Sequence, residues 1–423
     1  AFMTYAFSDY NIVSEKNGVA YVANTLSGAL IRLDEPSYQA VQSQNLAQLS
    51  EKDRDFLADN GVLVEDTMDE KRMLRAAYTA FSRGRTSVTV IVCPTLECNF
   101  ACPYCFESRQ TGVMSGETQA HVLDYVKDIL SRGYKELELS WFGGEPLLYP
   151  EIITEMSPKI KALCEEKQVQ CRFVITTNGY CINEKVMDMF RALAFKEVRI
   201  TLDGGREVHD TRRMLRSGRG TFDVIVAKVK KLSAQGIHVK VRVNMDKQNP
   251  NALEDVKKEL GGLENVYIYP ATVSEEPTQD DCQREKCFTG DDEVGAFHQA
   301  LYEKYDFKPT FESLFNKGVS CCMAEHDDSC VIDHKGYVYK CVNDVGHPAW
   351  AVCNVNGDYT AKNPRVVAKY LGRDPFNEEP CRECKFLPLC YGGCVNAYAR
   401  CGVHTCAQVK YLFDSIVATT LGV

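Results

Sequence analysis

Residues 87–105 read Ser-Val-Thr-Val-Ile-Val-Cys-Pro-Thr-Leu-Glu-Cys-Asn-Phe-Ala-Cys-Pro-Tyr-Cys. The β-branched run Val88–Val92 predicts a buried strand, and the proline and polar residues that follow it predict a loop. Within that loop, Cys98, Cys102 and Cys105 have C-x3-C-x2-C spacing. The stretch therefore places a group of three thiols just after the end of a strand.

This strand is the first of a repeating pattern of β-rich and amphipathic helical stretches. The sequence predicts strands at Val88–Val92, Glu136–Trp141, Cys171–Thr176, Glu197–Leu202, His238–Val243 and Asn265–Tyr269. Repeated βα units imply an α/β fold with a parallel sheet and outer helices, and right-handed crossovers would curl six of them into a partial (β/α)6 barrel. In such folds the chemistry lies at the C-terminal ends of the strands, where the three thiols are expected.

Three thiolates suit an iron–sulfur cubane, because they bind three of its irons and leave the fourth for a ligand from outside the protein. Zinc is the alternative for clustered cysteines. A structural zinc site needs four ligands, however, and no histidine lies near this motif. The pattern therefore favours a [4Fe–4S] cluster.

Cys98, Cys102, Tyr104 and Cys105 match the C-x3-C-x-aromatic-C motif of the radical S-adenosylmethionine (SAM) superfamily, which the chain resembles. The resemblance implies that SAM binds the open iron, that Tyr104 approaches the adenine, and that an electron from the cluster cleaves SAM to a 5′-deoxyadenosyl radical. Gly-Gly-Glu alone is most often a plain turn, but its position after the next strand fits the family. The implied cofactor contacts are Gly143, Gly144, Glu145, Asn178, Thr201 and Arg213.

The C-terminal region carries a second cysteine pattern, which resembles the SPASM extension and its two auxiliary [4Fe–4S] clusters. The resemblance assigns Cys341, Cys394 and two of Cys321, Cys322 and Cys330 to auxiliary cluster I. It assigns Cys381, Cys384, Cys390 and Cys406 to auxiliary cluster II. A pair of zinc ribbons stays open as an alternative, because short C-x2-C pairs also bind zinc.

Two other regions bear on substrate and ligands. Residues 4–80 predict a hairpin at Asn17-Gly18 followed by helices, and this small winged-helix-like unit resembles the leader-recognition element of peptide-maturing enzymes. A structural cap on the barrel is an equal alternative. Cys282 and Cys287 lie in a charged stretch and could be alternative ligands or thiols that face the substrate.

Length, charge and composition limit the classes of protein to which this sequence can belong. The 423 residues exceed the size of one core, and we expect domains at 4–80, 87–305 and 306–423. A net charge of −9 does not favour nucleic-acid binding, and no apolar run is long enough to span a membrane. Without a recognisable signal sequence we expect a cytoplasmic protein, in which clustered cysteines hold metal more often than they form disulfides.

The resemblance as a whole implies an enzyme that acts on a ribosomally made precursor peptide with a leader, reduced by a flavodoxin or ferredoxin. The leading hypothesis is the formation of thioether crosslinks, as in sactipeptide or ranthipeptide synthases, and a carbon–carbon crosslinking cyclase is a close variant. Sulfatase-maturing enzymes carry an aspartate directly after the cysteine that corresponds to Cys341. Here that residue is Val342, with Asp344 two positions on, which disfavours formylglycine formation. A non-enzymatic electron-transfer protein would need no SAM motifs.

Overall fold

The computed structural model describes residues 4–273, 288, 290–305, 310–315 and 322–423. Its contacts divide the chain into two compact units. Unit 1 consists of Ala1–Gly84, Gly290–Cys322 and Arg373–Val423, and unit 2 consists of Arg85–Thr289 and Met323–Gly372. The three domain ranges expected from the sequence stay a prediction.

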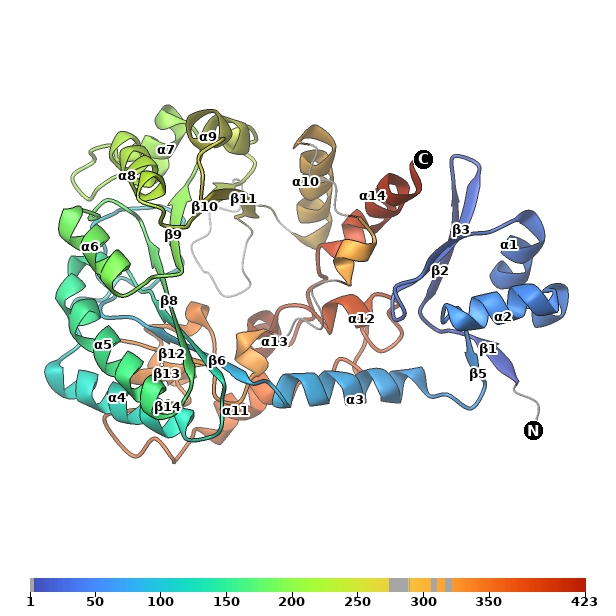
Figure 1. The fold of residues 1–423 in the computed structure, drawn as a ribbon, viewed down its shortest axis with the longest axis horizontal. Helices are drawn as coiled ribbons and strands as arrows, with labels where there is room; N and C mark the ends of the chain where they lie inside the picture. The colour runs from blue at the N-terminus through green and yellow to red at the C-terminus, as the bar shows by residue number, and fades with distance from the viewer. Residues whose placement is uncertain (1–3, 274–287, 289, 306–309, 316–321) are drawn as a thin grey trace. The chain divides into compact units, whose positions relative to one another are not determined.

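Unit 2 is built on one nine-stranded sheet, shown at the left of Figure 1. Six neighbouring strands are parallel: β6 (Ser87–Val92), β7 (Glu136–Trp141), β8 (Gln170–Thr177), β9 (Glu197–Leu202), β10 (Val239–Met245) and β11 (Val266–Thr272). They lie in the order β11-β10-β9-β8-β7-β6, so β11 and β6 do not pair and the sheet is open. The predicted α/β fold with a parallel sheet is confirmed.

Three short strands extend the sheet beyond β6. β12 (Cys330–Ile332) pairs in parallel with β6, and β13 (Tyr337–Tyr339) and β14 (Cys353–Asn354) follow as antiparallel neighbours. The sequence analysis did not assign these strands. Segments that are distant in sequence therefore share one sheet with the strand that leads into the cysteine motif.

Helices separate the parallel strands and bury the apolar residues of one sheet face. They are α4 (Gly116–Leu130), α5 (Pro150–Glu166), α6 (Glu184–Ala192), α7 (Arg206–Arg212), α8 (Phe222–Ala234) and α9 (Ala252–Leu260), and α11 (Pro364–Leu371) ends the unit. Ser115 caps α4 by accepting a hydrogen bond from the Thr118 amide, as expected for a helix start. Alternate strand residues such as Val239, Val241 and Val243 are fully buried or nearly so, which fixes the strand register.

Unit 1 contains the N-terminal hairpin and helices. An antiparallel sheet is formed by β2 (Asn11–Lys16), β3 (Val19–Asn24) and β4 (Leu30–Arg32), and β1 (Tyr5–Phe7) pairs with β5 (Leu63–Glu65). The helices are α1 (Glu35–Gln42), α2 (Glu51–Asp59) and α3 (Glu70–Arg83). Asn17 and Gly18 both have positive φ angles, so the predicted two-residue turn is present. The winged-helix-like assignment stays a prediction.

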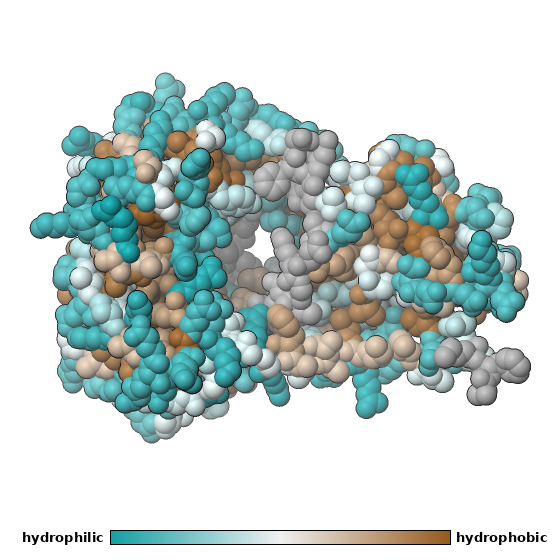
Figure 2. Space-filling model, viewed as in Figure 1, coloured by the Kyte–Doolittle hydropathy of each residue, from teal (hydrophilic) through white to brown (hydrophobic). Residues whose placement is uncertain are grey.

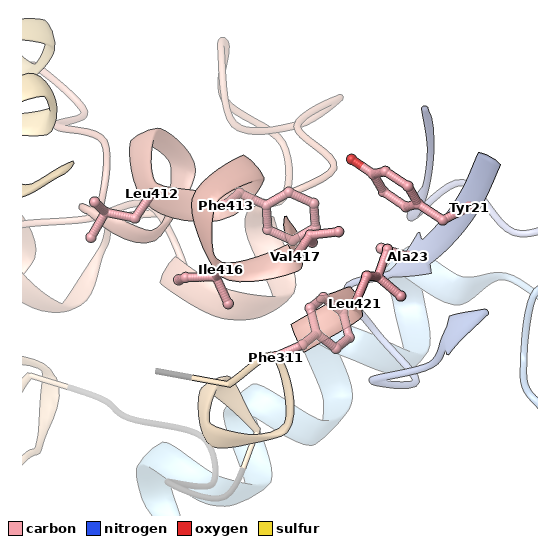
Figure 3. Close-up of a cluster of buried hydrophobic side chains, with 8 residues drawn as sticks. All are labelled: Tyr21, Ala23, Phe311, Leu412, Phe413, Ile416, Val417 and Leu421. Carbon is pink, nitrogen blue, oxygen red and sulfur yellow. The ribbon is translucent and has the colours of Figure 1, made fainter. Parts of the chain in front are cut away.

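The rest of unit 1 includes α14 (Val409–Leu421), which packs against this hairpin. It also contains α10 (Gly290–Tyr305), α12 (Leu387–Cys390) and α13 (Val395–Cys401). Figure 3 shows Phe413, Val417 and Leu421 of α14 facing Tyr21 and Ala23 of β3 in one buried apolar cluster. Chain segments from both ends of the sequence therefore share a core.

The surface of unit 2 and the length of the helices show whether the described residues could cross a membrane. Figure 2 shows mainly hydrophilic side chains along the outer rim of unit 2. Among the described residues, no helix combines the length and apolar character needed to cross a membrane.

Candidate active site

A cavity of about 760 Å³ lies within unit 2. Its walls come from the loop after β6, from the C-terminal ends of β7 to β11, and from the inner face of β9 and β10. Cys98, Cys102 and Cys105 all line it. The structure thus brings the three thiols to the position that the sequence predicts, in a space large enough for a small ligand.

The three thiols lie close enough to influence one another's ionisation. The pKa of Cys98 is raised to about 12, mainly by burial, with smaller contributions from the Glu145 carboxylate and from the neighbouring Cys102 and Cys105. Burial likewise raises the pKa of Cys105 to about 11. Three thiolates can coexist here only beside a strong positive charge, which iron supplies. The donor set therefore fits an iron–sulfur cluster bound by three cysteines.

Gly143 and Gly144 allow the turn after β7 to approach the cysteine loop closely. A Cβ atom on Gly143 would lie 2.3 Å from the Thr95 carbonyl oxygen, and one on Gly144 would lie 2.2 Å from that of Glu97. The Gly144 amide donates to the Thr95 carbonyl at 3.2 Å. Both glycines also line the cavity, so close packing and access to a ligand both require the absence of a side chain at these positions.

Glu145 is fully buried and does not line the cavity. Its carboxylate accepts hydrogen bonds from the Thr177 hydroxyl at 2.7 Å, the Asn178 amide at 2.7 Å and the Leu147 amide at 2.9 Å. Burial raises the pKa of this carboxyl group, while these hydrogen bonds oppose the change. In this structure Glu145 ties the turn after β7 to the end of β8, and its contact with SAM stays a prediction.

Tyr104 is the centre of a polar network beside the cysteine motif. Its hydroxyl donates to Asp203 at 2.8 Å and accepts from Arg213 at 2.9 Å and from Asn244 at 3.2 Å. Arg213 also lies over the Phe100 ring, 5.7 Å from its centroid. The network holds Tyr104 and Arg213 together at the cavity wall, where the sequence predicts cofactor contacts.

Arg212 contacts the ring of Tyr104 in the same network. Its guanidinium lies 5.1 Å from the Tyr104 ring centroid and forms ion pairs of 2.8 Å with both Asp203 and Asp246. Because two carboxylates of the protein already neutralise Arg212, its guanidinium attracts an anionic ligand only weakly. The other two predicted contacts, Asn178 and Thr201, also line the cavity.

Sequence reasoning did not identify Glu107, Arg242 and Asn244 as part of this site, although all three line the cavity. The pKa of Glu107 is raised to about 8, mainly by burial and to a smaller extent by the Glu145 carboxylate. Arg242 and Asn244 belong to β10, in which polar residues alternate with buried valines. That period-2 pattern was the available signal, since it places both side chains on one face of the sheet.

A family model described as "Radical SAM superfamily" matches residues 92–260. The chain carries a radical SAM domain. Radical SAM proteins use a [4Fe–4S] cluster and SAM, and the three thiols on the wall of one cavity match that requirement.

Relatives of this radical SAM protein extend the comparison beyond that domain. The cysteine-type anaerobic sulfatase-maturating enzyme of Clostridium novyi (strain NT) is 23% identical over 342 residues, covering 73% of this chain and 88% of that protein. The anSMEcpe structure with bound AdoMet and Cp18Cys peptide has a TM-score of 0.58 at 17% identity and covers 80% of this chain and all of that one.

Streptococcus suis SuiB has a similar fold, with a TM-score of 0.53 at 14% identity over 92% of this chain and 96% of its own. A further SuiB structure contains the precursor peptide SuiA. At these identities the structural likeness shows a shared fold.

The C-terminal cysteines of this radical SAM protein form a second site within unit 1. Cys381, Cys384, Cys390 and Cys406 line one cavity of about 50 Å³. The pKa of Cys381 is raised to about 11, mainly by burial and to a smaller extent by the other three thiols. The structure thus brings together the four residues expected for auxiliary cluster II, and a group of four neighbouring thiols fits a cluster bound entirely by cysteine.

The residues expected for auxiliary cluster I belong to different compact units. Cys322 and Cys394 are in unit 1, whereas Cys330 and Cys341 are in unit 2. Cys321, Cys282 and Cys287 lie outside the described residues. Cys330 is buried on β12, where burial raises its pKa to about 12 and a hydrogen bond with Tyr125 of α4 opposes the change. The ligand set of cluster I stays a prediction.

Proposed function

We propose that this protein is a radical SAM peptide maturase that installs thioether crosslinks in a ribosomally made precursor peptide. One observation carries the proposal: three thiols line one cavity of about 760 Å³ at the C-terminal ends of a parallel sheet. Cys98, Cys102 and Cys105 would hold the catalytic [4Fe–4S] cluster, and two auxiliary clusters would be bound by the C-terminal cysteines. The cavity leaves room for SAM and part of a peptide.

The chemistry is a two-electron oxidation. A thioether forms when a cysteine S–H and a carbon C–H of the peptide are replaced by an S–C bond, with loss of one hydrogen atom, one proton and one electron. When bound, a reduced [4Fe–4S] cluster and SAM supply the radical that takes the hydrogen atom. An auxiliary cluster would accept the electron, and a flavodoxin or ferredoxin would supply the electron that starts each cycle.

The described side chains support binding and orientation around that chemistry. Tyr104, Arg213 and Asn244 are fixed to one another by hydrogen bonds, so the wall beside the thiols is organised before any ligand arrives. We propose that Gly143, Gly144, Asn178 and Thr201 join them in contacting SAM, and that Glu145 either contacts SAM or positions the turn that does.

Relatives of similar fold support a peptide substrate. The anSMEcpe structures are described with bound peptides, and SuiB is described with its precursor peptide SuiA. We propose that residues 4–80 form a winged-helix-like unit that binds the leader, followed by a partial barrel at 87–305 and an auxiliary-cluster domain at 306–423. Strand β2 is an edge of its sheet, and an extended leader could pair with such an edge.

Formylglycine formation is the second candidate, because curated relatives include sulfatase-maturating enzymes. The geometry after Cys341 argues against it. Val342 and Asn343 line the cavity, whereas Asp344 is fully buried and accepts a short hydrogen bond from the Tyr370 hydroxyl. The position after Cys341 therefore presents an apolar side chain, which cannot accept the substrate's proton.

The proposed function is tested by searching the neighbouring genes for a short cysteine-containing peptide and using it as the substrate. The peptide is incubated anaerobically with reconstituted enzyme, SAM and reductant, and then analysed by mass spectrometry. We expect the loss of two hydrogen atoms per crosslink, with one cysteine protected from alkylation. Loss of two hydrogens with every cysteine still alkylated would indicate a carbon–carbon cyclase, and replacement of a cysteine sulfur by oxygen together with loss of two hydrogens would indicate formylglycine. Either result would contradict the thioether assignment.

A further inference from the structure

The inner wall of the cavity carries cationic side chains in two neighbouring rows across β9, β10 and β11. The strand register places Lys240 beside Arg199 and Tyr267 in the lower row, and Arg242 beside Thr201 and Tyr269 in the row above. All of these residues line the cavity. The two rows therefore face the same cavity, and the partners of their cationic side chains can be compared.

The lower row is neutralised by carboxylates of the protein itself. Lys240 pairs with Glu197 at 2.6 Å, and Arg199 forms a short ion pair with the same carboxylate. Arg199 also lies 4.0 Å from Glu138. Because these cations already pair with buried or half-buried carboxylates, their positive charge is largely neutralised and attracts an anionic ligand only weakly.

Arg242 in the upper row differs from them. Its Nε donates to the Asn244 side-chain oxygen at 2.9 Å, and in the part of the chain that the structure describes no carboxylate pairs with its guanidinium. The side-chain nitrogen of Asn244 in turn donates to the Tyr104 hydroxyl at 3.2 Å. Arg242 is thus held through Nε, and its two Nη groups are left for a planar, two-oxygen acceptor.

The other arginines of this region are less exposed than Arg242. Arg212 pairs with Asp203 and Asp246, and Arg213 donates to Tyr104, although Arg213 Nε has no hydrogen-bond partner among the described residues. Because Arg242 is the most exposed of the three arginines, both of its Nη groups are accessible to an anion that enters the cavity. A carboxylate matches the geometry of a guanidinium whose Nε is already bonded.

We propose that Arg242, held by Asn244, binds a carboxylate group of a molecule in the cavity. Two sources share this chemistry: an acidic residue of the substrate peptide and the carboxylate of SAM. The peptide source rests on the proposed function, but binding is measured without turnover, so the two ideas can fail separately. Arg242 would then determine which peptide segments are accepted or contribute to cofactor affinity.

The first arm of the test measures SAM. The dissociation constant is determined by anaerobic equilibrium dialysis on reconstituted wild-type protein, Arg242→Gln and Arg242→Lys. Arg219→Gln is the matched control, because Arg219 is exposed and lies outside the cavity lining. If SAM is the source, Arg242→Gln weakens SAM binding by about tenfold or more, as expected for loss of a charge-assisted pair, and Arg242→Lys weakens it less.

The second arm uses two synthetic peptides in the presence of SAM, acetyl-Gly-Ser-Cys-Gly-Asp-Gly-Ser amide and its counterpart with Asn in place of Asp. If the peptide is the source, wild type and Arg219→Gln bind the Asp peptide more tightly by about tenfold, and Arg242→Gln does not distinguish the two peptides. An unchanged SAM affinity in Arg242→Gln, together with no preference of wild type for the Asp peptide, would overturn the inference.

Discussion

The two cysteine sites differ in both the number of thiols and the space around them. Cys98, Cys102 and Cys105 stand on the wall of a cavity of about 760 Å³, whereas Cys381, Cys384, Cys390 and Cys406 surround one of about 50 Å³. A cubane bound by three thiols keeps an iron for a ligand, and the first cavity has room for that ligand. The second site has the thiols to bind all four irons and little space for anything else.

The sites also differ in what holds their loops in place. The first follows strand β6, which is paired on both sides within the large sheet. The second lies among short helices, and α12 has only four residues. We infer that the sheet organises the first site before a cluster binds, and that bound metal contributes more to the folding of the second.

The largest effect should come from removing the three thiols of the first site. The variant with Cys98→Ala, Cys102→Ala and Cys105→Ala should lose about a third of the iron of a three-cluster protein and all 5′-deoxyadenosine formation. Because the sheet positions the loop, its thermal unfolding should change little. Iron analysis, product chromatography and calorimetry check this, and persistent SAM cleavage would refute the assignment.

Removing two thiols of the second site should instead affect mainly the stability of the protein. Cys384→Ala with Cys390→Ala should lower the melting temperature by several degrees and speed hydrogen exchange in residues 373–423, since the cluster's binding energy contributes to local folding. Cys401→Ala, an exposed cysteine in the same region that is not an expected ligand, is the control. Equal stability of the double variant and the control would remove the distinction between the two sites.

The packing of the first loop can be tested without changing a thiol. Gly144→Ala would place a methyl group 2.2 Å from the Glu97 carbonyl oxygen and should destabilise the protein by ~3 kcal/mol. Gly116→Ala is the matched control, because open space surrounds that position at the start of α4. Denaturant unfolding should separate the two variants, and a neutral Gly144→Ala would mean that the loop is not tightly held.

A smaller effect is expected at the polar network beside the first site. Tyr104→Phe removes the hydroxyl that Arg213 and Asn244 donate to and should cost ~1–3 kcal/mol of stability. Tyr267→Phe alters an exposed tyrosine of the same cavity and should stay within ~0.5 kcal/mol of wild type. Similar values for the two variants would show that the network adds nothing to this wall.

Near neutral pH the smallest effect comes from His209, which changes acid stability near the same network. His209 is fully buried, and burial together with the nearby arginines lowers its pKa from 6.5 to about 3. Between these values the unfolded chain binds a proton that the folded protein does not. Stability should therefore fall as the pH drops below about 6.5, by up to ~1.4 kcal/mol per pH unit from this residue. His209→Gln should reduce that slope, and an unchanged slope would contradict the shifted pKa.

The sequence predicted the elements that follow strong local patterns. The strands from Val88–Val92 to Asn265–Tyr269 and the turn at Asn17-Gly18 were found because β-branched runs and the Asn-Gly pair specify them locally. The position of the motif after the first strand also predicted that the three thiols lie at the C-terminal edge of the sheet, where they line one cavity.

Features that depend on tertiary contacts were not predictable in this way. β12 has three residues, too few for a periodic signal, and its pairing with β6 spans more than two hundred residues of sequence. The buried position of Glu145 arises from hydrogen bonds with Thr177 and Asn178 on another strand, and the Gly-Gly-Glu motif does not show which way its carboxylate faces.

The contrast between an open and a closed cluster is tested most directly by electron paramagnetic resonance of dithionite-reduced protein with and without SAM. The account predicts that SAM changes the spectrum of the wild type and does not change that of the variant lacking the thiols of Cys98, Cys102 and Cys105. A wild-type spectrum that does not respond to SAM, or an equal response in the variant, would contradict it.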